Sequence, residues 1–182
     1  TKLEDASIGV KLLSTNNPVQ ANNYVNKILK TYNKNKLLFN NAIESSIRQV
    51  YSQKYKENKS IFIMSDYDNG YNGAIANRLA IKFNVPSIVI ARRKGTHFKG
   101  SCRSVEGIDI LSFINAHKNI FLNSGGHPMA AGFVIEEKNI HEFENLLFNF
   151  MKNQQINNIN KRSTIDGNIS FKDINSKMLH FL

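Results

Sequence analysis

The longest hydrophobic pattern in the chain begins near residue 18 and continues to about residue 55. Apolar side chains recur there every three or four positions among many asparagines and lysines, which predicts one long or broken helix. Asn17 can cap this helix, and Pro18 suits a first-turn position that needs no backbone donor. Because polar residues fill the rest of its surface, we expect the helix to connect two domains more than to contribute to a single hydrophobic core.

From residue 60 onward the pattern changes to short alternating elements. An apolar strand at 60–65, a helix at 71–84 and a strand at 86–91 form a βαβ unit, for which parallel pairing is the default. Further elements follow in the order strand, short helix, strand and amphipathic helix, at 98–105, 109–118, 129–136 and 139–154. The predicted fold class is therefore α/β: a mixed, mainly parallel sheet flanked by helices and preceded by a long connector helix.

We divide the chain into a helical connector at 1–58, an α/β domain at 59–155, and a last segment at 156–182. That last segment starts as a polar linker and continues from Thr164 as the opening strand and helix of another unit, which stops at Leu182. We therefore expect this chain to be a piece of a longer protein.

Charge adds a candidate partner to this picture. The formal net charge is +10, and the basic residues concentrate at 92–103, which holds five cations and no acid. Such an excess attracts the phosphates of a polyanion, although a basic solvated surface remains the alternative. The chain has no apolar run of membrane-spanning length and no signal-peptide pattern, so we expect a cytoplasmic protein without a membrane partner. Its single cysteine, Cys102, is read as a small, semi-buried residue.

Two stretches offer phosphate-binding chemistry. Gly70 and Gly73 stand at a predicted helix entrance, where backbone donors can hold an anion, with Arg78 one turn further in; such glycine pairs also simply cap and pack helices. Lys99, Ser101 and Arg103 would share one face of a predicted strand, with Ser104 next to them. Two cations that flank a hydroxyl make a good phosphate clamp, and an edge strand protected by charges is the alternative.

The stretch NSGGHPMAAGF at 123–133 places Gly125 and Gly126 directly before His127. The glycines allow close approach of a ligand to the main chain, and a histidine beside a glycine turn suits a phosphate or a metal oxyanion. A tight turn explains the glycines equally well. Asp66 and Asp68 lack the spacing of a calcium loop, and the histidines show no ligand spacing, so we predict no metal site.

In this order and spacing, GYNGAIANRL, KGSCRS and SGGHPMAAG resemble the DHH phosphoesterase superfamily, and specifically its DHH-associated, substrate-binding domain. Within the superfamily they look most like the exonucleases of single-stranded DNA, and the resemblance extends over nearly the whole chain. The long helix resembles the connector of those enzymes, and residues 164–182 resemble the start of an OB-fold. The resemblance implies a bacterial 5′-to-3′ exonuclease whose N-terminal DHH domain holds manganese or magnesium.

Carried over to this sequence, the resemblance assigns Ser101 and Arg103 to a DNA 5′ phosphate, with Lys99 on the same strand. It assigns Gly125, Gly126 and His127 to a loop that faces the metal site, where His127 contacts the scissile phosphate or its neighbour. No Asp-His-His motif occurs in the chain, so we expect it to bind no catalytic metal and to be inactive alone.

The implied partners are single-stranded DNA, the DHH domain of the same protein, and single-strand-binding protein. A phosphodiesterase of short oligonucleotides or cyclic dinucleotides, and a stand-alone nucleic-acid-binding module, remain as alternatives.

Overall fold

A computed structural model describes residues 6–53, 55–67, 69–154, 169–171 and 174. Within these residues there are six α-helices: α1 (Ser7–Ser14), α2 (Pro18–Tyr51), α3 (Tyr55–Asn58), α4 (Asn72–Phe83), α5 (Ile110–Ala116) and α6 (Ile140–Lys152). The strands are β1 (Ile61–Ser65), β2 (Ser87–Lys94), β3 (His97–Arg103), β4 (Phe121–His127) and β5 (Ala130–Glu136). Short 3-10 helices lie at Asn69–Tyr71, Lys118–Ile120 and Glu137–Asn139. The segments predicted to form a linker and the start of an OB-fold fall almost entirely outside the described residues.

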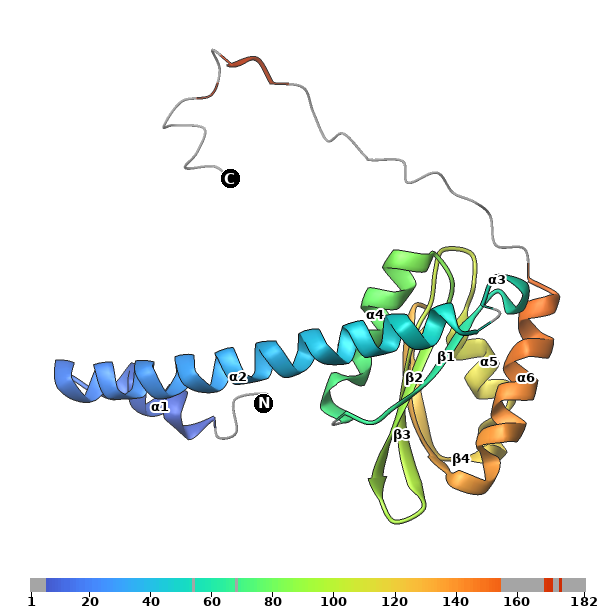
Figure 1. Cartoon of the computed structure of the whole chain (residues 1–182), viewed down its shortest axis with the longest axis horizontal. Coiled ribbons are helices and arrows are strands. Elements are labelled where there is room, and N and C mark those ends of the chain that lie inside the picture. Colours follow the sequence, from blue (N-terminus) through green and yellow to red (C-terminus); the bar gives the residue numbers. More distant parts are fainter. Residues whose placement is uncertain (1–5, 54, 68, 155–168, 172–173, 175–182) are drawn as a thin grey trace.

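The long helix is confirmed as α2. The Asn17 side chain accepts hydrogen bonds from the backbone N–H groups of Val19 (2.9 Å) and Gln20 (3.2 Å), as expected for a helix N-cap. Only three residues of α2 are buried, all in its second half: Ala42, Ser46 and Val50. The first half extends well beyond the sheet, with α1 beside it (Figure 1). The helix thus packs on the domain with one end only.

The five strands form one sheet in the order β1-β2-β3-β5-β4, so the predicted mixed α/β class is confirmed. β1 and β2 pair in parallel through the crossover helix α4. The description of the sheet as mainly parallel is wrong, because the other three pairings are antiparallel. Two-residue turns, Gly95–Thr96 and Pro128–Met129, join β2 to β3 and β4 to β5, and such short connections permit only antiparallel neighbours.

Each face of the sheet carries its own hydrophobic cluster. On one face α5 and α6 cover the sheet, and the Phe143 ring contacts the rings of Phe62, Phe113, Phe121 and Phe133. On the other face α4 and the second half of α2 cover β1 and β2, around Ile63, Ile75 and Leu79. Cys102 lies in the first cluster, where burial raises the pKa of its thiol to about 12. This thiol is therefore a packing group and not a nucleophile.

Gly100 is required by the aromatic packing. A Cβ built on Gly100 would lie 2.2 Å from Cζ of Phe133, its cross-strand partner. We expect Gly100→Ala to lower the free energy of unfolding by about 1–3 kcal/mol, because the ring must leave its position in a close-packed core. Urea unfolding measures the effect. Gly132→Ala is the control, since its Cβ would approach no atom closer than 3.7 Å; equal midpoints for the two variants would contradict this account.

Candidate nucleic-acid interface

The open part of the sheet lies beside α4. Side chains of β3 and β5 alternate between buried positions, which face α5 and α6, and partly exposed positions on the opposite face. On that opposite face the second cluster comprises residues of β1, β2, α2 and α4, and none of β3, β5 or β4. In the described part of the chain, α4 lies against β3 on this face, and no helix of the second cluster covers β5 or β4. We call the surface formed by β3, β5 and β4 beside α4 the open face.

The strand register arranges the predicted residues in rows across the open face. Directly opposed residues of antiparallel strands project to the same side of a sheet. One row runs through Arg103, Ala130 and His127; the next runs through Ser101, Gly132 and Gly125; and the third runs through Lys99, Val134 and Asn123. Two strand spacings separate the ends of each row, a backbone distance of roughly 10 Å. Small residues thus form a low floor between the cations of β3 and His127 on β4.

The Arg103 side chain lies against the first turn of α4. A Cβ built on Gly73 would be 3.2 Å from Nη2 of Arg103 and 3.7 Å from Oγ of Ser101, so the bare glycine provides the space for both groups. Arg103 Nη1 donates a hydrogen bond to the Cys102 carbonyl oxygen at 2.8 Å. The helix is fastened to β3 by the buried Asn72, whose Nδ2 donates to the Lys99 carbonyl at 2.7 Å. The first turn of α4, with Gly73, and the basic strand β3 were predicted as two separate candidate sites. In the structure they form one site.

The charge of this site is uncompensated in the described part of the chain. Arg103 and Lys99 make no ion pair with a carboxylate there, whereas Arg92 is held by Glu137 at 2.8 Å. Arg103 and Ser101 are partly buried and Lys99 is exposed. A guanidinium, an ammonium and a hydroxyl on one face, without an acid, suit a phosphate group.

Gly125, Gly126 and His127, here called the GGH segment, form the end of edge strand β4. The prediction that they form a loop is therefore wrong. The two glycines differ. A Cβ on Gly126 would lie 2.3 Å from the Ala130 carbonyl oxygen and 2.6 Å from Ala131 Cα, so the backbone pairing of β4 with β5 excludes any side chain there. A Cβ on Gly125 would meet no atom within 4 Å. Gly125 and His127 are exposed on the open face.

Two predicted residues lie apart from this arrangement. Ser104 is buried, and its hydroxyl donates to the Ile108 carbonyl at 2.6 Å, so it fixes the loop before α5. Arg78 is exposed on α4 and is rotated about the helix axis by about 140° from Gly73. Among the described residues, neither side chain forms a hydrogen bond with the side chain of Arg103 or Ser101.

Sequence reasoning missed Asn77 and Asn123. Asn77 is exposed about one turn after Gly73, on the same stripe of α4, and the helical period alone would have indicated it. Asn123 joins the Lys99 row only through the β4–β5 register, which required β4 to be recognised as a strand. Both amides are exposed.

The described residues contain no cluster of three or more histidine, cysteine or acidic side chains that could hold a metal ion. The described part of the chain therefore lacks a set of side chains that could bind manganese or magnesium. None of the helices in the described ranges is long and apolar enough to cross a membrane.

Comparison with known proteins identifies the class of domain. The model of the DHHA1 domain family matches residues 55–153, more than half of the chain. The chain belongs to this family, and the resemblance to the DHH-associated domain is confirmed.

Several proteins with similar sequences are RecJ exonucleases. "Single-stranded-DNA-specific exonuclease RecJ" of Bacillus subtilis is 24% identical over 148 residues, covering 80% of this chain and 19% of the relative. The RecJ of Haemophilus influenzae is 35% identical over 85 residues, which is 44% of this chain and 15% of that protein. The crystal structure of RecJ from Thermus thermophilus in complex with Mn2+ superimposes with a TM-score of 0.71 at 22% identity over 85% of this chain and 23% of that one, which shows the shared fold. This chain thus spans about a quarter or less of the length of these relatives.

Proposed function

We propose that this chain is the substrate-binding part of a RecJ-like exonuclease that degrades single-stranded DNA from its 5′ end. One observation supports this most directly: Arg103 and Ser101 lie together against the bare backbone of Gly73, on an open face without a compensating acid among the described residues. The names of the sequence relatives support the choice of substrate.

In this proposal Arg103 and Ser101 hold the 5′ phosphate, and Lys99 adds charge on the same strand. His127, two strands away in the Arg103 row, contacts the scissile phosphate or its neighbour. The floor of Ala130 and Gly132 leaves room for the intervening nucleotide. Because all these contacts are to the backbone, binding is independent of base sequence. The chain's own residues bind and position the strand, and the hydrolytic step belongs to the DHH domain of the same protein.

We further propose that helix α2 is the connector to the DHH domain of the same protein, consistent with its exposed first half. Manganese or magnesium would be held by that domain, and the isolated chain would be inactive. Single-strand-binding protein is a further proposed partner, and the proposed location is the bacterial cytoplasm.

A length series tests this function against the alternatives. A surface that follows a DNA backbone gains affinity with strand length, so we expect single strands of ~10 or more nucleotides to bind more tightly than dinucleotides. Fluorescence anisotropy with labelled oligonucleotides measures the difference. Preference for a dinucleotide or a cyclic dinucleotide would favour a sibling phosphodiesterase and contradict the exonuclease.

His127→Ala tests the role of the GGH histidine in a protein that carries both this domain and the DHH domain. We expect turnover to fall by about 10²-fold or more while DNA affinity changes by less than about threefold, because His127 would act on the reacting phosphate more than on ground-state binding. Steady-state rates and a separate binding titration in the absence of metal measure the two effects. Unchanged turnover would remove the role assigned to His127.

A further inference from the structure

The β2–β3 hairpin projects beyond the rest of the sheet (Figure 1). It carries two consecutive arginines, Arg92 and Arg93, in a segment that also contains Lys94 and Lys99. The open-face site uses neither of them. Arg92 is bound by neighbouring residues, whereas Arg93 is exposed. This difference suggests separate roles for the two side chains.

Arg92 is a structural residue. Its Nη1 donates to the Gly95 carbonyl at 2.6 Å, its guanidinium forms a bidentate pair with Glu137 at 2.8 and 3.2 Å, and it lies 4.6 Å from the centre of the Phe98 ring. The Glu137 N–H donates to the Thr96 carbonyl at 2.8 Å. Hydrogen bonding to Glu137 raises the pKa of Arg92. Together these contacts fix the turn of the hairpin to the segment before α6.

Arg93 is exposed, and in the described ranges it has no carboxylate partner. His97 and Lys99, at the start of β3, are exposed as well. Glu137 and Glu136, which lie near the hairpin turn, are already paired: Glu137 with Arg92, and Glu136 with Lys138 at 2.7 Å. The hairpin therefore presents positive charge on a turn held in place by other residues.

The hairpin is continuous with the open face. His97, Lys99, Ser101 and Arg103 alternate along one side of β3, which leads from the turn to the Arg103 site. At about 3.4 Å per residue, Arg103 lies roughly 20 Å from His97 along the strand. A strand whose first phosphate lies at Arg103 and whose next phosphate lies at His127 can reach the hairpin by turning back across β5 toward the start of β3.

We propose that Arg93, with Lys99, forms a second phosphate-binding surface for the part of a single-stranded nucleic acid that leads away from the 5′ phosphate. This inference rests on the proposed function and extends it to the occupant of the hairpin. Charge complementarity and continuity along β3 support a nucleic-acid backbone as that occupant. Arg92 acts here as a positioning residue, since it holds the turn of the hairpin whose strand β2 carries Arg93.

Arg93→Gln in the 182-residue chain tests the proposal. With a 5′-phosphorylated oligothymidylate of ~10 or more nucleotides, we expect affinity to fall about three- to tenfold and the slope of log K against log salt to decrease by about 0.7, as for one lost phosphate contact. Binding of a 5′-phosphorylated dinucleotide should be unchanged. Arg93→Lys should keep the salt slope. Arg48→Gln removes one exposed positive charge from α2, outside the hairpin, and should change neither quantity.

Equal effects of Arg93→Gln and Arg48→Gln on the long strand would overturn the proposal. So would loss of affinity for polyglutamate without any change for the oligonucleotide, because that result would assign the hairpin to an acidic protein. Failure of the proposed function looks different: the unmodified chain would bind phosphorylated and unphosphorylated ends equally, whatever Arg93 contributes to long strands.

Discussion

Replacement of Arg103 by alanine is expected to abolish the preference of this chain for a 5′-phosphorylated single strand. The guanidinium lies beside Ser101 and Gly73, without an acidic partner among the described residues, and is available for a charge-assisted bond to phosphate. Such a bond contributes about 1.5–3 kcal/mol, so affinity for the phosphorylated strand should fall about ten- to hundredfold. Affinity for the same strand with a 5′ hydroxyl should change much less. Anisotropy titrations with the two strands measure the ratio.

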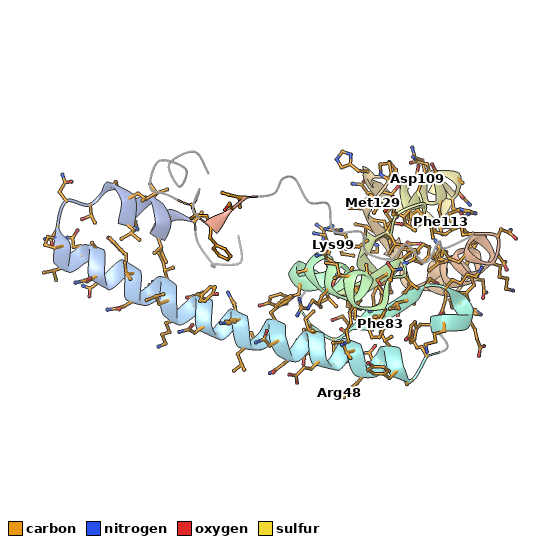
Figure 2. The ribbon with its side chains drawn as sticks, turned by 90° about the horizontal axis from the view of Figure 1, so that it is seen from above. Arg48, Phe83, Lys99, Asp109, Phe113 and Met129 are labelled. Carbon is orange, nitrogen blue, oxygen red and sulfur yellow. The ribbon has the colours of Figure 1, made fainter. Side chains whose placement is uncertain are left out.

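Two further variants make the Arg103 result specific. Arg103→Lys keeps the charge but loses the planar fork of donors, so it should recover only part of the preference. Arg48→Ala removes an arginine from α2, on the far side of that helix from the labelled Lys99 (Figure 2), and should leave the preference intact. If Arg48→Ala and Arg103→Ala weakened binding equally, only general charge would be involved and the clamp would be refuted.

The two adjacent glycines of the GGH segment are expected to respond in opposite ways to alanine. Gly126→Ala places a methyl group 2.3 Å from a backbone oxygen that cannot move aside without unpairing β4, and Gly126 also has a φ of +151°. We expect a loss of stability of about 2 kcal/mol or more. Gly125→Ala meets no protein atom within 4 Å, so it should leave stability unchanged while it obstructs a ligand on the open face.

Urea unfolding and DNA titration of both variants separate these effects. We expect a lowered unfolding midpoint for Gly126→Ala, and an unchanged midpoint with weakened DNA binding for Gly125→Ala. Normal binding by Gly125→Ala would mean that no ligand approaches this part of β4.

Local patterns predicted much of this structure. The Asn17 cap and the apolar period located α2, and the change to short apolar runs located β1, α4 and β2. Strand alternation placed Lys99, Ser101 and Arg103 on one face, because that property depends on neighbouring residues only. Cys102, between Ser101 and Arg103, lies on the other face of the strand, in the first hydrophobic cluster.

Sheet topology and β4 depended on contacts that the sequence pattern does not contain. β4 is rich in polar residues and glycine, since most of its side chains are exposed, and it therefore lacked an apolar signal. Gly95, with a φ of +54°, could have indicated the β2–β3 hairpin and hence antiparallel pairing. The meeting of Gly73 with Arg103 joins residues 30 positions apart and required the packing of α4 on β3.

The affinity of the unmodified chain for one single-stranded oligonucleotide, with and without a 5′ phosphate and across a salt series, directly tests whether Arg103 and Ser101 form a phosphate site. We predict salt-sensitive binding that is tighter with the phosphate at every salt concentration. Salt-sensitive binding that is indifferent to the phosphate would contradict it, and would leave the open face as a basic surface without a site for the 5′ end.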